Sequence, residues 1–289
     1  MKNSALILLA LVLIGLAGCA TASPIDPSDL SPQLPPISVD SPSRAFAAVV
    51  WGLTNVDASA YGGWSGACPG CDVDAKRDYN ELMPRGIPVE LLLNFGATKS
   101  AAQAAIAKQA SGLASGDELL IFYSSHGALV DDVDGDEKDG TGQDSALVMY
   151  DGLWVDDDFL AFLESVVPDG VRVRIFSDCC HSEGNFRGYV RSFQQAVSFG
   201  SWGKLPRFEL RTKKKLSFSI TQLAGCKKLK YSYGADDGGV WTTTFWDSQN
   251  GTWKASFDDA AKKMPSDQTP AWVEDGPMSD EIRNAPMFP

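Results

Sequence analysis

Two apolar segments that end on reactive side chains constrain what this chain can fold into. Residues 119–127 form one segment and end on His126, and residues 172–184 form the other and carry Asp178 and Cys180. Apolar runs of this length are typical of strands in a parallel sheet, whose carboxyl edge presents reactive groups. Two strands that end on a cysteine and a histidine favour a Cys–His nucleophile pair.

Alternating strand and helix patterns along the chain predict an α/β fold with a mostly parallel central sheet and helices on both faces. Asp74 is a suitable first residue for one helix and Thr98 a suitable N-cap for the next. Besides the two segments above, we expect strands at 47–53, 88–93 and 216–222 and helices at 75–83, 100–113, 155–166, 242–248 and 252–264.

The charge balance limits the classes of partner. The chain of 289 residues holds 37 acidic and 25 basic residues, a formal net charge of −12. Nucleic acid is therefore an unfavourable partner, because phosphate binding needs a basic face. Divalent cations and basic peptide substrates suit this charge better. The sequence does not determine the oligomeric state, and a monomer is the default expectation.

The N-terminus has the pattern of a targeting segment. Residues 1–18 combine a short positive region with an apolar stretch that is shorter than the ~20 residues of a membrane-spanning helix. The closing Leu-Ala-Gly-Cys resembles a bacterial lipobox, which implies cleavage before Cys19, a lipid on that residue and an anchor in the cell envelope. Ala20 after it implies sorting to the outer membrane. An ordinary secretory signal cut near Ala20 or Ala22 is the alternative.

The remaining chain divides by composition. Residues 19–43 contain six prolines and predict an extended tether. A long basic loop then separates two folded regions. The expected parts are therefore a signal peptide at 1–18, the tether at 19–43, a large region at 44–184, the basic loop at 185–215 and a small region at 216–289.

Histidine is scarce, which narrows the choice of base. The chain has two histidines, and His181 directly follows Cys180. Adjacent residues of an extended segment point in opposite directions, so His181 is badly placed to serve Cys180. His126 is therefore the expected base, and Cys179 and His181 are expected to be structural.

Both segments resemble a known family. The runs Asp-Cys-Cys-His-Ser at 178–182 and Tyr-Ser-Ser-His-Gly at 123–127 resemble the metacaspase and orthocaspase branch of the caspase-like cysteine peptidases. Further similar runs are at 70–75, 134–137 and 268–270, so the likeness covers most of the chain. The resemblance implies a caspase-like sandwich in which Cys180 is the nucleophile and His126 its partner. It also implies an oxyanion hole made by the amides of Gly127 and Cys180.

The resemblance also implies a specificity. The acids that match Asp74 and Asp178 line the primary pocket of metacaspases, which implies cleavage after Arg or Lys. Charge-assisted contacts to a guanidinium support this interpretation. Asp74 is also suited to be a helix cap. The basic loop is at the position where relatives carry their subunit junction, so we expect self-cleavage there, after Arg207, Arg211 or one of the lysines 213–215.

Acidic residues at 131–158 raise the question of a metal. An EF-hand starting at Asp132 fails, because Glu137 stands where that loop needs glycine. The resemblance points to a calcium site at Asp144, Asp156 and Asp157, whose hard oxygens suit Ca²⁺. A solvated loop followed by acids at a helix start is the alternative.

Several features leave other functions open. Ser125 replaces a glycine of the family pattern and Glu183 interrupts its His-Ser-Gly run, so a non-catalytic binding module is an alternative. Cys68 and Cys71 form a CxxC pair, which fits a disulfide, a thiol oxidoreductase or, with Cys180 and His126, a zinc site. Cys226 is either a core residue or the partner of Cys179.

Overall fold

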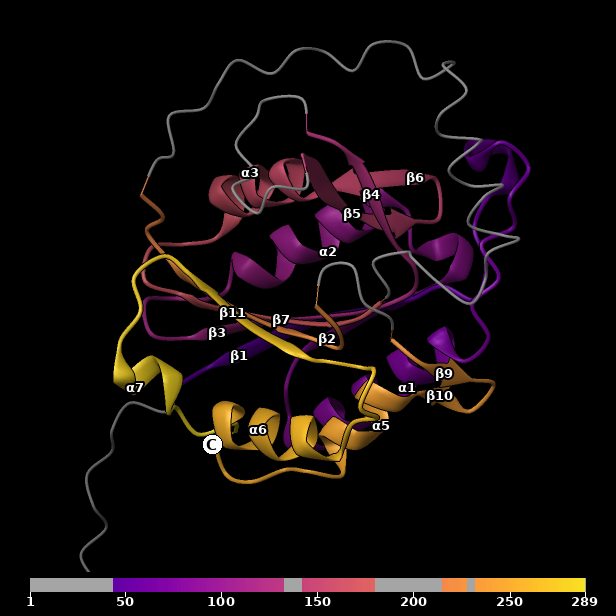
Figure 1. The fold of residues 1–289 in the computed structure, drawn as a ribbon. Helices are drawn as coiled ribbons and strands as arrows, with labels where there is room; N and C mark the ends of the chain where they lie inside the picture. The colour runs from indigo at the N-terminus through magenta and orange to yellow at the C-terminus, as the bar shows by residue number, and fades with distance from the viewer. Residues whose placement is uncertain (1–43, 133–141, 180–214, 228–231, 289) are drawn as a thin grey trace, which may run out of the picture. The chain divides into compact units, whose positions relative to one another are not determined.

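The computed structural model describes residues 44–132, 142–179, 215–227 and 232–288. Its main feature is a six-stranded sheet in the order β11-β8-β7-β3-β1-β2, in which only the β11–β8 pair is antiparallel (Figure 1). The mostly parallel sheet predicted from the sequence is confirmed. The strands are β1 (Phe46–Gly52), β2 (Val89–Leu93), β3 (Glu118–Ser124), β7 (Arg172–Asp178), β8 (Ser219–Ala224) and β11 (Ala271–Asp275).

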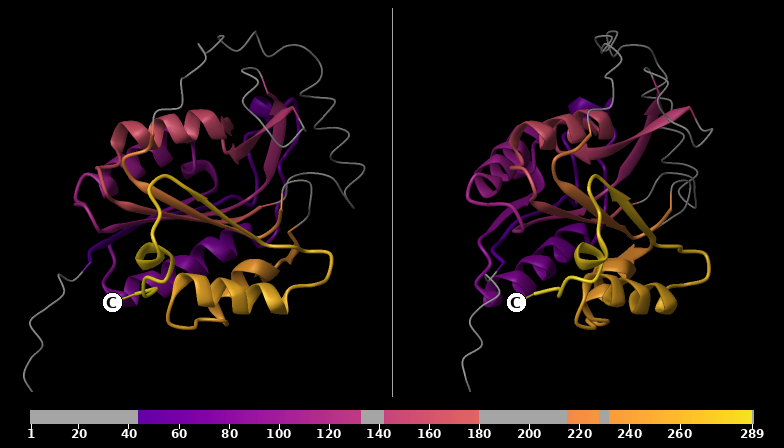
Figure 2. Two further views of the ribbon diagram at one scale, coloured as in Figure 1. Left: turned by 60° about the vertical axis from the view of Figure 1, so that its left-hand side comes forward. Right: turned by 90° about the vertical axis from the view of Figure 1, so that its left-hand side faces the viewer.

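Helices cover both faces of this sheet, as predicted. One face carries α1 (Cys71–Leu82), α5 (Val240–Trp246) and α6 (Trp253–Lys263), and the other carries α2 (Lys99–Ala110) and α3 (Asp156–Val166) (Figures 1 and 2). The chain passes from β1 to β2 on one side and then returns to β3 on the other side. Right-handed crossovers in opposite directions put their helices on opposite faces, and the crevice between β1 and β3 is where such sheets bind ligands.

Alternation along the central strands divides the core into two halves. Ile121 and Tyr123 of β3 pack with the side of α2 and α3, whereas Leu120 and Phe122 pack with the side of α1, α5 and α6. All four side chains are buried. Because successive residues of a strand face opposite sides, the position of a residue at the end of a strand decides which face it serves.

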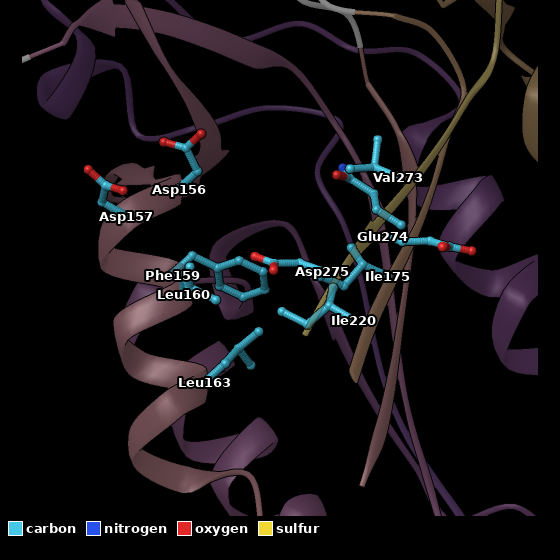
Figure 3. Close-up of a pocket in the computed structure, with 11 residues that line it drawn as sticks. Asp156, Asp157, Phe159, Leu160, Leu163, Ile175, Ile220, Val273, Glu274 and Asp275 are labelled. Atoms are coloured by element: carbon cyan, nitrogen blue, oxygen red, sulfur yellow. The ribbon is translucent and has the colours of Figure 1, made fainter. Parts of the chain in front are cut away.

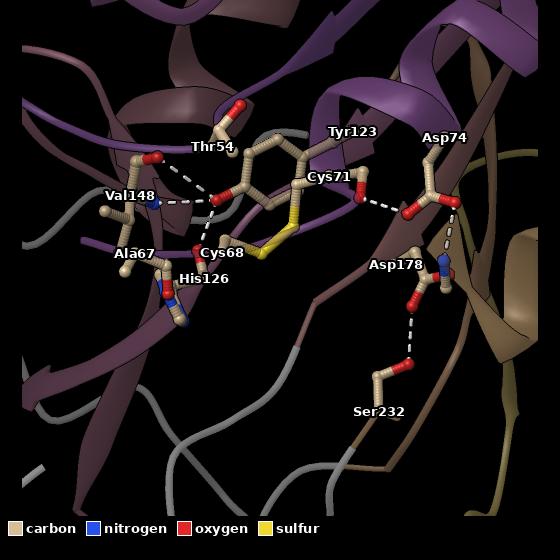
Figure 4. The surroundings of a disulfide bond; sticks show 12 residues. Thr54, Ala67, Cys68, Cys71, Asp74, Tyr123, His126, Val148, Asp178 and Ser232 are labelled. Carbon is tan, nitrogen blue, oxygen red and sulfur yellow. Dashed lines mark hydrogen bonds between the residues drawn. A yellow bond between two sulfur atoms is a disulfide. The ribbon is translucent and has the colours of Figure 1, made fainter. Parts of the chain in front are cut away.

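A second, three-stranded antiparallel sheet follows β3. It consists of β4 (Gly127–Asp131), β5 (Gln143–Met149) and β6 (Gly152–Val155), in a region where the sequence predicted an acidic loop. The Tyr123 hydroxyl at the end of β3 donates to the carbonyl of His126 and accepts from the amide of Val148 at 2.9 Å (Figure 4). One side chain therefore fastens the small sheet to the central one.

Helix boundaries agree with the sequence prediction except at α1. The Thr98 hydroxyl accepts from the Ala101 amide at 3.1 Å and caps α2 as predicted, and Thr252 caps α6 in the same way. The remaining elements are η2 (Ala58–Tyr61), η3 (Met83–Arg85), η4 (Asn94–Gly96), β9 (Gly234–Ala235), β10 (Gly238–Gly239) and α7 (Asp280–Arg283). The described part of the chain contains no helix long and apolar enough to cross a membrane.

Removing the Tyr123 hydroxyl tests the link between the two sheets. We expect Tyr123→Phe to lower the free energy of unfolding by about 1–3 kcal/mol, because the partly buried His126 carbonyl loses its hydroxyl donor and the Val148 amide keeps only its 3.2 Å bond to that carbonyl. The matched control is Tyr61→Phe, whose buried hydroxyl donates to the Met149 carbonyl at 2.6 Å, and which should cost about 1 kcal/mol. Denaturant unfolding measures both losses, and equal losses would contradict a special role for Tyr123.

Candidate active site

The strand register brings the sequence-predicted residues to one edge of the sheet. Gly52 of β1 lies beside Ser124 of β3, and Ser124 lies beside Asp178 of β7. Ser124 and Asp178 have the same strand parity as Phe122 and Phe176, which pack on the side of α1 and α5. Both side chains therefore face that layer of helices.

Asp74 meets this edge from α1. The helix begins at Cys71 with Gly70 before it, so the expectation that Asp74 starts or caps the helix is wrong. Gly70 has a φ of +86°, and a Cβ there would lie 2.0 Å from the carbonyl oxygen of Ala235, so only glycine fits this entry. With the helix starting earlier, Asp74 is buried, and its Oδ2 accepts from the Ser124 hydroxyl at 2.7 Å.

A segment from the C-terminal region completes the surroundings of both acids (Figure 4). The Asp178 oxygens accept from the Ser232 hydroxyl at 2.5 Å and from the amide and hydroxyl of Thr242 at 2.9 and 2.8 Å. The Gly239 amide donates to Asp74 Oδ1 at 2.7 Å. A Cβ on Gly239 would lie 2.1 Å from Asp178 Oδ2 and 3.0 Å from Asp74 Oδ2. Gly239 therefore packs directly against both carboxylates and leaves no room for a side chain.

Burial makes this pair of acids electrostatically unfavourable when both are charged. It raises the pKa of Asp74 to about 7, and the negative charge of Asp178 adds to the rise. Burial also raises the pKa of Asp178. Asp78 lies one helical turn beyond Asp74 and is buried, and its Oδ1 accepts a hydrogen bond from the Trp246 indole Nε1 at 2.7 Å. Burial raises the pKa of Asp78 well above the usual range. A bound cation would relieve this concentration of acid groups.

His126 lies between β3 and β4, where the Tyr123 hydroxyl holds its carbonyl. Its Nε2 is 3.1 Å from the carbonyl oxygen of Ala67, and its ring packs 4.9 Å from that of Trp64. Because a carbonyl only accepts, Nε2 carries the hydrogen in this contact and Nδ1 is left as an acceptor. Burial lowers the pKa of His126, which favours the neutral form that a general base requires.

Cys68 and Cys71 are joined in a disulfide beside His126 (Figure 4). The bond argues against the zinc alternative for this pair, since neither sulfur is a zinc-binding thiolate in this state. It closes a loop of only four residues, which in the chain-entropy account stabilises the fold by about 2 kcal/mol. Because the closed loop is short, the bond constrains the backbone of residues 68–71 directly.

The predicted nucleophile, Cys180, lies outside the described residues, as do His181, Glu183 and Cys19. Gly127, the other expected oxyanion-hole residue, begins β4 opposite Leu147. Cys179 is buried, and the Cys226 thiol donates to its carbonyl at 3.2 Å, so both are core residues as one of the alternatives had it. The roles of Cys180 and Gly127 stay predictions.

The predicted calcium ligands lie close to one another in the folded chain. The β5–β6 register pairs Ala146 with Val155, which places Asp144 and Asp156 at the same end of the hairpin. Asp156 Oδ2 accepts from the Ser145 amide at 3.3 Å, and Asp157 follows it in the first turn of α3. No group of three or more ligating side chains is assembled among the described residues. The described part of the chain therefore does not form a complete site.

A cavity of about 250 Å³ opens between α3 and the strands β7, β8 and β11 (Figure 3). Phe159, Leu160 and Leu163 form its helix wall and Ile175 and Ile220 its sheet wall, with acids at its rim. Of the predicted functional residues, its lining includes the proposed metal ligands Asp156 and Asp157 but none of the catalytic or specificity residues. It is therefore separate from the edge where Asp74 and Asp178 meet.

Sequence reasoning missed the groups that hold the two acids. Ser124 belongs to the motif around His126 but has no predicted role, and no sequence pattern points to Ser232, Gly239 or Thr242 as partners of the acids. Ser232 and Thr242 are 54 and 64 residues beyond Asp178 in the chain, and Gly239 is 165 residues beyond Asp74. Hydroxyls and glycine amides carry no periodic signal, so only the fold reveals these partners.

A parallel α/β sheet whose edge gathers a histidine and a buried acid pair next to the Asp-Cys-Cys-His segment defines a protein of the caspase-like class. The chain belongs to the Caspase domain family of peptidases, which matches residues 55–273. Metacaspase-4 of Arabidopsis thaliana is 34% identical over 134 residues, 43% of this chain and 32% of that protein. Metacaspase-2 of Trypanosoma brucei brucei is 30% identical over 173 residues, 54% of this chain and 47% of that protein.

A solved structure supports the same fold. The crystal structure of protein GSU0716 from Geobacter sulfurreducens matches with a TM-score of 0.69 and 28% identity, covering 84% of this chain and 98% of that one. The matched stretches span about a third to a half of the length of the two metacaspases named above. The family resemblance and the caspase-like α/β fold predicted from the sequence are confirmed.

Asp74→Asn tests the electrostatics of the acid pair. Folded Asp74 keeps its proton up to pH about 7, whereas the unfolded chain loses it near pH 4, so its ionisation makes stability fall as pH rises between these values. Relative to wild type, Asp74→Asn should therefore gain melting temperature as pH rises from 5 to 8. Asp72→Asn is the control, because Lys76 lowers the pKa of Asp72 to below this range. A parallel pH dependence in wild type and Asp74→Asn would contradict the assignment.

Proposed function

We propose that this protein is a cysteine endopeptidase that cleaves peptide bonds after arginine or lysine. The observation that carries the proposal is the buried carboxylate pair of Asp74 and Asp178, at the sheet edge where β3 leads into His126. Membership of the Caspase domain family supports the peptidase class. The specificity and the roles of individual residues are our inference.

In the proposed reaction, His126 Nδ1 takes the proton of the Cys180 thiol and the sulfur attacks the carbonyl carbon of the substrate. The amides of Gly127 and Cys180 donate to the developing oxyanion. The C–N bond breaks as His126 returns the proton to the leaving amine, and water then hydrolyses the thioester. The contact from Nε2 to the Ala67 carbonyl supports this role, because it orients the ring with Nδ1 as the acceptor.

The acid pair supports a basic residue on the acyl side of the cleaved bond. Two buried carboxylates that pack against the same glycine repel each other when ionised, and binding of a guanidinium or ammonium group would offset that repulsion. An acidic substrate side chain would add a third negative charge there. Partners are therefore expected among proteins or peptides with arginine or lysine.

Cys180→Ala and Asp178→Asn test the two halves of the proposal. Against a peptide library, we expect Cys180→Ala to lose activity by at least about a thousandfold, because the nucleophile is gone. Asp178→Asn should lower kcat/KM for Arg and Lys substrates about 10- to 100-fold, the cost of losing one charged partner. Cys179→Ala, the neighbouring buried thiol, is the control and should retain activity. Cleavage of basic peptides by Cys180→Ala would exclude this mechanism.

A non-catalytic caspase-like binding module is the second candidate. It is favoured by Ser125, which is buried directly before His126 where the family pattern has glycine. A basic-peptide electrophile decides between the two, since it labels Cys180 only if the thiol is activated. A CxxC oxidoreductase is less well supported, because it gives no role to the buried acid pair or to His126 at the end of β3.

We further propose that calcium assists the enzyme and that the chain cleaves itself in the basic loop. Asp144, Asp156 and Asp157 are the residues that would bind the ion, although the described residues do not complete the set, so no reaction step is assigned to it. A lipid anchor at Cys19, a place in the bacterial cell envelope at the outer membrane and a monomeric state remain proposals from the sequence. None of them affects the reaction above.

Intact-mass analysis after calcium addition tests the self-cleavage. We expect cuts after Arg207, Arg211 or one of the lysines 213–215 in wild type, and their loss when a chelator removes the ion. Cys180→Ala is the control and should stay intact. A wild-type chain that labels with the electrophile but shows no cut with calcium would contradict self-processing.

A further inference from the structure

We propose that the Cys68–Cys71 disulfide is a positioning element for the base His126. The bond connects the exposed loop that contacts the His126 ring to a rigid point at the start of α1. Its effect on catalysis rests on the proposed function, whereas its effect on the imidazole does not. The inference depends on three sets of contacts around the bond.

The loop contributes the groups that surround the His126 ring. Ala67 accepts from Nε2 through its carbonyl, and Trp64 packs against the ring. Ala67 itself is exposed, as are the neighbouring Ser65 and Pro69, so little side-chain burial holds this stretch in place. A shift of the loop would therefore move both the Ala67 carbonyl that accepts from Nε2 and the Trp64 ring that packs on the imidazole.

Two backbone hydrogen bonds hold the loop against the chain that follows β1. The Val56 amide donates to the Ser65 carbonyl at 2.9 Å, and the Cys68 amide donates to the Thr54 carbonyl at 2.9 Å. Beyond these two bonds, Cys68 is joined to Cys71 by the disulfide and by a longer hydrogen bond from the Cys71 amide to the Cys68 carbonyl, at 3.2 Å. Since Ala67 directly precedes Cys68, the bond acts one residue away from the carbonyl that orients the base.

The other sulfur is fixed in the core. Cys71 is buried as the first residue of α1, and a Cβ on Gly52 would lie 2.3 Å from its carbonyl oxygen, so the helix start packs directly on the end of β1. Asp74 follows one turn later on the same helix. The disulfide therefore links the loop that contacts His126 covalently to α1, the helix that carries Asp74.

Reduction of the bond is a two-electron step. A dithiol such as dithiothreitol attacks one sulfur, the S–S bond breaks, Cys68 and Cys71 each take up a proton, and the reagent becomes a cyclic disulfide. The predicted nucleophile requires the opposite state, because Cys180 acts only as a thiol or thiolate. We therefore infer that the mature site needs one reduced cysteine beside one oxidised pair.

NMR titration of His126 tests the positioning role without any turnover. In a Cys180→Ala background, we compare the disulfide-bonded chain with Cys68→Ser, which leaves the buried Cys71 in place. His181→Gln assigns the second histidine resonance. Burial is the main cause of the lowered pKa of His126, so loosening the loop should raise that pKa toward its ordinary value. Reduction with dithiothreitol should reproduce the shift and reoxidation should reverse it.

Lys76→Ala is the matched control, an exposed change on α1 whose ion pair with Asp72 lies outside the loop, and it should leave the titration unchanged. In the active chain, Cys68→Ser should lower kcat about tenfold or more with little change in KM for an Arg substrate. An unchanged pKa and an unchanged kcat in folded Cys68→Ser would overturn the proposal. If wild type has no peptidase activity, the titration alone decides it.

Discussion

The candidate site depends on one constraint, which is that two buried carboxylates of like charge need donors on every oxygen. Asp74 and Asp178 obtain these donors from three parts of the chain: the end of β3, the segment around Ser232 and the start of α5. No local structure could supply them, so the C-terminal region has to pack on α1 before the pair is stable. The proposed specificity acids therefore become stable only when the C-terminal region is folded onto α1.

The sheet separates this acid pair from the base by strand parity. Ser124 points to the side of α1 and contacts Asp74, whereas Tyr123 points to the other side and anchors the small sheet through Val148. His126 lies two residues after Ser124. Its carbonyl accepts from the Tyr123 hydroxyl, and its ring Nε2 donates to the Ala67 carbonyl. A one-residue slip of β3 would exchange the faces of Ser124 and Tyr123, so the proposed specificity acids and the proposed base both depend on the register of this strand.

The sequence predicted the elements whose signals are local. β1 and the cap at Thr98 are predicted because continuous apolar runs and capping hydroxyls act within a few residues. The start of α1 was placed too late, because Gly70 enters the helix through a left-handed conformation that a neighbouring carbonyl imposes. β4 to β6 were missed because acids dominate the composition there, although β5 alternates between buried and partly buried residues. The donors to the acid pair come from distant positions, which local signals do not report.

The proposed site needs Cys180 as a thiol and Cys68 and Cys71 as a disulfide. Both states can exist together if solvent thiols reach Cys180 more easily than they reach the disulfide. Thiol–disulfide exchange requires a thiolate to reach a sulfur, and Cys71 is buried at the start of a packed helix while Cys68 is partly covered. A nucleophile must instead be open to its substrate, so mild thiols reach it first. In an oxidising compartment the Cys68–Cys71 disulfide forms. Reduction of Cys180 alone would then leave the loop at His126 unchanged. With Cys71 buried, thiol attack on the bond is restricted to the half-buried Cys68 sulfur, which favours survival of the disulfide beside the proposed nucleophile.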